Sequence, residues 1–133
     1  MYNASTLDAS MDDVARHLPL SPHQFQILLA LVDGERHGYG IILEIDERTR
    51  GAMRLGTGTL YTALARLVHG GLITESARRP PAADDDDRRR YYRLTPLGRA
   101  VLRAEASRLE ALVRQARGKG IHPSERPAWS RSR

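Results

Sequence analysis

The stretch that decides the fold is Arg88-Arg89-Arg90-Tyr91-Tyr92-Arg93-Leu94-Thr95. Its second part is rich in aromatic and apolar residues, so we expect a β-strand over residues 89–94. Thr95 suits the N-cap of a helix, and the proline after it suits the first helical position. The three adjacent arginines either attract phosphate or form a solvated cluster on an exposed hairpin. The sequence on either side of this stretch is needed to distinguish between these two interpretations.

Four helices are predicted before this strand. Residues 7–18 place apolar side chains on one face, and residues 21–33 begin with a capping box, in which Ser21 caps and Gln24 reaches back. The apolar stripe of the first helix consists of Leu7, Met11, Val14, Ala15 and Leu18, and that of the second consists of Phe25, Leu28, Leu29 and Val32. The third helix, at about 37–50, has a stripe of Tyr39, Ile42, Leu43 and either Ile45 or Asp46. The early glycines of the third helix, Gly38 and Gly40, indicate that something packs close to the backbone there.

A fourth helix, at 57–70, has an apolar stripe of Leu60, Leu64, Leu67 and Val68. A strand at 72–79 and a loop at 80–87 then lead to the returning strand. The fold class is therefore mainly α with a small antiparallel β-hairpin. This order of elements is that of a winged helix-turn-helix, with an N-terminal helix before it and a long helix after it.

The last helix, at 96–117, would be about 33 Å long. Its apolar stripe runs close to a heptad and consists of Val101, Leu102, Glu105, Ala106, Leu109, Leu112, Val113 and Ala116. The small helical core offers too little surface for a helix of this length, so we expect a partner helix to cover part of it. Residues 118–133 are rich in Gly, Pro, Ser and Arg, and we predict a disordered basic tail.

In a helix-turn-helix, the recognition helix enters the major groove by its N-terminal end. The residues predicted to contact DNA from this helix are Thr57, Gly58, Thr59, Tyr61 and Thr62. Arg66, in the third turn, suits a phosphate contact and a surface salt bridge equally well. From the wing we predict contacts by Arg88, Arg89, Arg90 and Tyr91, while Tyr92 shares the inward side of its strand with Leu94.

These motifs resemble the PadR family of transcriptional regulators over about residues 20–117. The segments that carry the resemblance are Ser21-Pro22, His37-Gly38-Tyr39, Gly58-Thr59-Leu60-Tyr61 with Ala63-Leu64 and Leu67, Gly70-Gly71-Leu72-Ile73, and Arg89-Arg90-Tyr91-Tyr92-Arg93-Leu94-Thr95 with Gly98-Arg99. The single helix after the wing is typical of the short subfamily.

The resemblance implies a homodimeric repressor that binds a palindromic promoter site on double-stranded DNA. It implies an N-terminal helical extension (1–19), a winged helix-turn-helix domain (20–95), a dimerisation helix (96–117) and the tail (118–133). In such proteins the final helix makes most of the dimer, helped by the N-terminal helix. The residues that we assign to dimerisation are Leu102, Glu105, Leu109, Leu112, Val113, Leu7 and Met11.

Two features depart from the family pattern. The wing tip carries four acids, Asp84 to Asp87, which would repel phosphate if they faced DNA. The only tryptophan is Trp129, in the tail, and the final helix has no aromatic residue, which disfavours the aromatic drug site of some small members. No effector can be named from the sequence.

Composition narrows the alternatives. The chain has 133 residues, a net charge of +5 and no cysteine, which suits a polyanionic partner and excludes thiolate chemistry. We find no catalytic nucleophile–base pair, no metal-ligand spacing and no cofactor motif, so we expect no enzyme activity, no metal and no cofactor. Without a membrane span or signal peptide, we expect a cytoplasmic protein. The competing hypothesis is a winged-helix module that binds protein instead of DNA.

Overall fold

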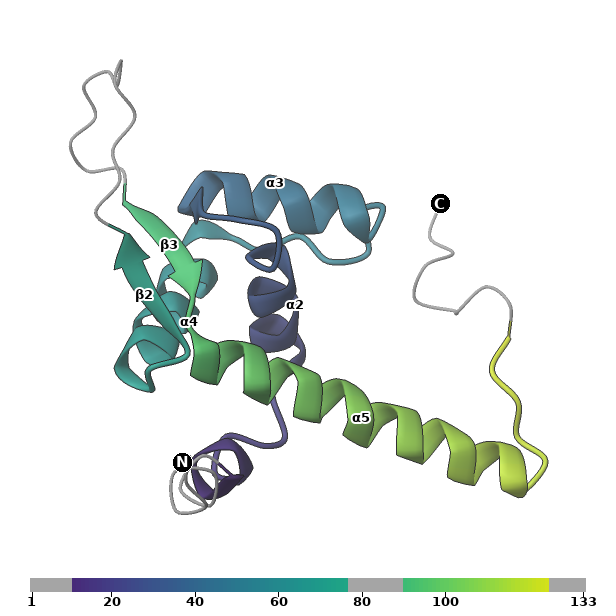
Figure 1. The fold of residues 1–133 in the computed structure, drawn as a ribbon. Coiled ribbons are helices and arrows are strands. Elements are labelled where there is room, and N and C mark those ends of the chain that lie inside the picture. Colours follow the sequence, from purple (N-terminus) through teal and green to yellow (C-terminus); the bar gives the residue numbers. More distant parts are fainter. Residues whose placement is uncertain (1–10, 77–89, 125–133) are drawn as a thin grey trace.

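The computed structural model describes residues 11–76 and 90–124, drawn in colour in Figure 1. Residues 11–15 are helical, which agrees with the predicted N-terminal helix, while Leu7 lies outside the described residues. The elements that follow are α2 (Pro22–Ala30), β1 (Arg36–His37), α3 (Gly38–Arg48), α4 (Thr57–His69), β2 (Ile73–Ser76), β3 (Tyr91–Leu94) and α5 (Pro96–Gly118).

The predicted helix caps are confirmed. The Ser21 hydroxyl accepts from the Gln24 backbone N–H at 3.1 Å, and the Gln24 side-chain oxygen accepts from the Ser21 backbone N–H at 3.3 Å. This capping box satisfies two of the amide groups that a helix start leaves open. Thr95 caps α5 in a similar way, because its hydroxyl accepts from the Gly98 N–H at 2.9 Å.

The sheet has three strands rather than the predicted two. Its order is β1-β3-β2, and both pairings are antiparallel. The additional strand, β1, pairs Arg36 with Tyr92 and His37 with Tyr91. Two residues are too few to show the alternating pattern of a strand, so the sequence does not predict β1. The strand is defined by its pairing with β3, which lies far along the chain. The wing strand β3 is thereby paired on both of its edges.

The core lies where α2, α3, α4 and the start of α5 meet. Its largest fully buried side chains are Ile27, Leu28, Leu31, Ile41, Ile45, Leu60, Leu64, Leu67, Leu72, Ile73 and Val101. The stripe predicted for α4 is confirmed at its three leucines, but Val68 is exposed. Tyr92 is 5% exposed, as its inward position on the strand predicts. Burial in this core raises the pKa of the Tyr92 hydroxyl.

The stripes predicted for α2 and α3 need correction. In α2, Val32 is exposed because the helix ends at Ala30 and a turn follows. In α3, the predicted Tyr39 and Leu43 are exposed and Ile42 is half-buried. Ile45, one of the two alternatives for the end of the stripe, is fully buried, as is Ile41, which was not predicted. This segment carries apolar residues on more than one side, so its periodicity allowed two phases, and packing against α2 and α4 selected the other one.

The long helix α5 has two environments. Figure 1 shows its first turns against the body of the protein and its later turns extending away. The contact at the start is tight, because a Cβ added at Gly98 would lie 2.0 Å from the carbonyl oxygen of Leu72. Only glycine fits this approach between the helix and the chain that enters β2.

Candidate nucleic-acid interface

The exposed face of α4 carries the residues that the sequence predicts for DNA contact. Thr57, Gly58, Thr59, Tyr61 and Thr62 are all exposed. The helix begins at an N-cap glycine, which offers no side-chain hydrogen bond to the first turn. The amides of this turn are therefore open to an acceptor from outside, such as a phosphate oxygen. No residue of α4 is acidic, so nothing on the helix itself repels an anion.

The contact of Tyr61 with α3 fixes the position of α4. A Cβ added at Gly38 would lie 2.3 Å from the Tyr61 hydroxyl oxygen and 3.3 Å from Leu60. The close packing expected at this glycine is thus confirmed, and its partner is the recognition helix. Tyr61 remains 47% exposed, so the hydroxyl end of its side chain contacts α3 while much of the side chain faces solvent.

The wing strand packs against the start of α3. The rings of Tyr91 and His37 meet edge to face, with centroids 5.3 Å apart, and Tyr91 is half-buried. The Nδ1 atom of His37 accepts from the Gly40 N–H at 3.1 Å, so this histidine also caps α3. Because Tyr91 touches the cap of a helix-turn-helix element, its ring is less available to DNA than the alternation of the strand predicts.

The arginine run is only partly described. Arg90 is exposed, and its Nη1 donates to the Glu75 carboxylate at 2.9 Å across the strand pair. Arg88, Arg89 and the acids Asp84 to Asp87 lie outside the described residues. Glu75 neutralises part of the charge of Arg90, so this arginine contributes less to an anion-binding surface than an unpaired one.

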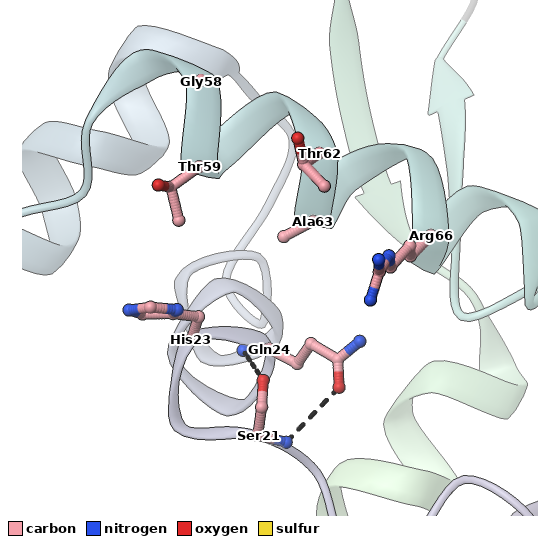
Figure 2. Close-up of a pocket in the computed structure, with 8 residues that line it drawn as sticks. All are labelled: Ser21, His23, Gln24, Gly58, Thr59, Thr62, Ala63 and Arg66. Carbon is pink, nitrogen blue, oxygen red and sulfur yellow. Dashed lines mark hydrogen bonds between the residues drawn. The ribbon is translucent and has the colours of Figure 1, made fainter.

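Arg66 extends from the third turn of α4. It is exposed and makes no ion pair with any residue in 11–76 or 90–124. It lines a groove of about 550 Å³ between α4 and the start of α2 (Figure 2). The residues lining this groove are Ser21, His23, Gln24, Gly58, Thr59, Thr62, Ala63 and Arg66.

The residues assigned to dimerisation divide into two groups. Leu102 is 7% exposed and Glu105 is 2% exposed, so both are covered within the protomer, and their assignment to the dimer surface is corrected. Leu109, Leu112 and Val113 are exposed. The helix approaches the body only along its first turns, so the single stripe of the sequence has two surroundings.

Glu105 is a buried carboxylate with an ion-pair partner on its own helix. Arg108 donates to both of its oxygens, from Nε at 2.9 Å and from Nη2 at 2.7 Å. These hydrogen bonds lower the pKa of Glu105, against the opposing effect of its burial. The heptad pattern placed this residue in a seam because it does not distinguish a paired carboxylate in a protomer core from one facing a partner.

An apolar groove of about 560 Å³ accompanies the exposed group. It runs between Phe25 of α2 and the later turns of α5, where Leu109 and Val113 line it. Met11, from the N-terminal helical segment, is 64% exposed. Exposed apolar side chains gathered along a helix suit an interaction surface.

Three solvent-facing or groove-lining residues were not assigned to a binding surface from the sequence. Tyr39 is 60% exposed at the start of α3, where its apolar character had suggested burial. His23 and Gln24 line the groove beside α4. The capping box could have indicated that Gln24 has a fixed side chain, but its neighbour on α4 depends on the tertiary fold.

Within residues 11–76 and 90–124, no group of three or more His, Asp or Glu side chains is arranged to hold a metal ion. In the same part of the chain, no helix is sufficiently long and apolar to cross a membrane.

The PadR-like family of transcriptional regulators matches residues 27–104 of the chain. This span contains α3, α4 and the whole sheet. The chain belongs to this family. PadR-like proteins are transcriptional regulators and not enzymes, which agrees with the expectation from the sequence.

Two relatives of this PadR-like chain extend the similarity. The transcriptional regulator Rv3488 of Mycobacterium tuberculosis is 36% identical over 99 residues, which cover 74% of this chain and 86% of the relative. An uncharacterized protein in transposon TN4556 of Streptomyces fradiae is 40% identical over 89 residues, or 67% of this chain. The match spans only 23% of the length of that Streptomyces protein.

Solved structures agree with the winged helix-turn-helix fold. A transcriptional regulator from Clostridium thermocellum superposes with a TM-score of 0.59 at 26% identity, covering 80% of this chain and 96% of that one. Bacillus subtilis PadR in complex with operator DNA superposes with a TM-score of 0.52 at 26% identity, covering 61% of this chain and 45% of that one. The fold class predicted from the sequence is therefore confirmed.

Proposed function

We propose that this PadR-like chain is a homodimeric repressor that binds a palindromic promoter site on double-stranded DNA. The observation that carries the proposal is the exposed face of α4, which presents hydroxyls, open first-turn amides and Arg66 with no acidic residue on the helix. A related protein, Bacillus subtilis PadR, has been solved with operator DNA, which supports the same use of the fold here. The cytoplasm is the compartment in which such a protein would act.

In this proposal, different residues contact the DNA bases and the DNA backbone. The hydroxyls of Thr59 and Thr62 suit base edges in the major groove, and Arg66 suits a backbone phosphate. The arginines Arg88 to Arg90 would add backbone contacts from the wing. Because base contacts specify and phosphate contacts position, α4 would determine the sequence and the wing would contribute mainly affinity.

The dimer follows from the exposed apolar residues of α5. Leu109, Leu112 and Val113 lie beyond the part of α5 that the protomer covers, and a second copy of the same helix offers a matching surface. A twofold arrangement of this kind presents two recognition helices in inverted orientation, so the preferred operator would be palindromic. Repression would result if the bound dimer blocks the promoter.

The experiment is a titration of a duplex taken from the region upstream of the chain's own coding sequence. Wild type should bind it, and the affinity should fall steeply with salt, because phosphate contacts release counterions. The double variant Arg88→Ala/Arg89→Ala should weaken binding and lower the salt slope by about 2, or about 0.9 for each lost contact.

The matched control for this variant is Arg114→Ala/Arg117→Ala, which removes the same charge from the exposed end of α5. It should leave the slope close to that of wild type. If wild type binds no promoter duplex, or binds one independently of salt, the competing hypothesis of a protein-binding module takes the place of the repressor.

A further inference from the structure

The groove in Figure 2 brings a second element beside the recognition helix. One wall is the start of α2, with His23 and Gln24, and the other is the exposed side of α4, with Thr62 and Arg66. None of the residues lining it is acidic. A polar groove next to a DNA-facing helix, without any anion of its own, suits a negatively charged group of the ligand.

The capping box fixes the direction in which Gln24 donates. Its side-chain oxygen accepts from the Ser21 backbone N–H at 3.3 Å. A carboxamide carries one acceptor oxygen and one NH₂ donor, so the use of the oxygen by the helix start directs the NH₂ group elsewhere. Figure 2 shows this nitrogen on the side of the groove where Arg66 lies.

Arg66 supplies donors to the same end of the groove from the opposite wall. A guanidinium has five N–H donors and no acceptor. Arg66 makes no ion pair with a residue in the described part of the chain, and the side-chain nitrogen of Gln24 cannot accept from it. Two donor groups that face one space without an acceptor between them are best satisfied by a bound anion.

We propose that Gln24 of α2 and Arg66 of α4 together bind one phosphate of the DNA backbone, at the edge of the major groove that receives α4. The inference rests on the proposed function, since it assumes that α4 faces DNA. A phosphate held between two helices fixes how α4 is seated, so α2 sets the register of the recognition helix. This contact contributes affinity and orientation, and it reads no base.

The informative variant is Gln24→Glu. The introduced carboxylate keeps an acceptor for the Ser21 N–H, and glutamate is favoured at this position of a capping box, so α2 should keep its stability. The donor that faced the groove becomes an anion, which would repel a phosphate and pair with Arg66. Binding of the upstream duplex should weaken about tenfold or more, and the salt slope should fall by about 1.

Gln26→Glu is the matched control. It makes the same change in charge two residues along the same helix, but the Gln26 side-chain oxygen faces Arg48 of α3 at 2.5 Å. Its effect on DNA binding should stay within about twofold, since only screened, long-range charge is altered. Arg66→Gln should weaken binding about as much as Gln24→Glu, and the two changes together should cost less than the product of their separate effects.

The outcomes separate this inference from the proposed function. If wild type binds no upstream duplex, the proposed function fails and the inference fails with it. If wild type binds but Gln24→Glu is no weaker than Gln26→Glu, only the inference is overturned. The groove would bind a free anion instead of DNA if inorganic phosphate shifted the Gln24 side-chain amide resonance while Gln24→Glu kept wild-type affinity for the duplex.

Discussion

The two halves of α5 share one apolar stripe but have different surroundings. In the first half, Gly98, Val101 and Leu102 are buried against the body of the protein. In the second half, Leu109 and Val113 face solvent in the protomer. The difference shows that a heptad-like pattern indicates that a face will be covered but not by which chain. The first half completes the core of its own protomer, and the second half is the surface that we propose for dimerisation.

The largest expected effect concerns the contact that anchors the first half. In Gly98→Ala the new methyl group would lie 2.0 Å from the Leu72 carbonyl oxygen and 2.9 Å from its carbon, both backbone atoms. The clash is removed only if the start of α5 or the backbone at Leu72 moves. The free energy of unfolding should therefore fall by about 3 to 5 kcal/mol. Urea denaturation measures this loss.

Gly118→Ala, at the far end of the same helix, is the control for that prediction. Nothing lies within 4 Å of a Cβ added there, so the variant should be neutral or gain up to about 1 kcal/mol from helix propensity. Equal stability of the two variants would show that the start of α5 is not anchored as tightly as the structure indicates.

The next effect concerns the second half. Leu109→Glu introduces two symmetry-related carboxylates into the proposed seam, where they would lose water without gaining a partner. Dimer association should weaken by about 3 kcal/mol, roughly a hundredfold in Kd. Sedimentation velocity across a range of protein concentrations would report the change, while thermal unfolding would show that the protomer remains folded.

Leu43→Glu provides a matched comparison for the seam. Leu43 is 48% exposed on α3, close to the 38% of Leu109, but it lies outside the stripe of α5. This variant should dimerise like wild type. A Leu109→Glu protein that also remains dimeric would place the seam elsewhere on the molecule.

The smallest effect concerns Glu105, at the boundary between the halves. Its pKa is lowered in the folded state by the hydrogen bonds from Arg108. The ionised carboxylate therefore stabilises the fold above its unfolded pKa, near 4.5, and this contribution is lost as the pH falls below that value. Glu105→Gln should cost about 1 kcal/mol at neutral pH, since Arg108 is partly exposed and the pair is screened.

The pH dependence is what makes this last prediction specific. The difference in unfolding free energy between wild type and Glu105→Gln should shrink between pH 7 and pH 3, as measured by urea denaturation at each pH. Glu110→Gln, on the exposed side of the same helix, should differ little from wild type throughout. If the difference in unfolding free energy between wild type and Glu105→Gln stayed constant with pH, the charge of Glu105 would not contribute to stability through its pair with Arg108.

Local features were the ones that could be predicted from the sequence. The caps at Ser21 and Thr95 depend on residues within one turn, and both formed as expected. The buried leucines of α4 were predictable because that helix is polar on its other face. The buried face of α3 was not predictable in the same way, since apolar or aromatic residues occur on more than one side of this helix and Tyr39 is the one that is exposed.

Features that depend on distant partners could not be predicted in the same way. β1 exists because Arg36 and His37 meet β3, more than fifty residues away in sequence. The exposure of the α4 residues followed from helical periodicity, whereas the proximity of Gln24 and Arg66 required two helices to be placed together. The division of α5 likewise depends on where the body of the protomer ends.

The pairing of β3 on both edges has a consequence for how this protein can vary. Arg36 is opposite Tyr92 on one side, and Glu75 is opposite the same residue on the other. The alignment of the wing strand is therefore set twice, independently of the number of residues that connect Ser76 to Tyr91. The number of residues in that connection can therefore change without shifting the strand, so the length of the wing tip can vary while β3 keeps its place beside α3.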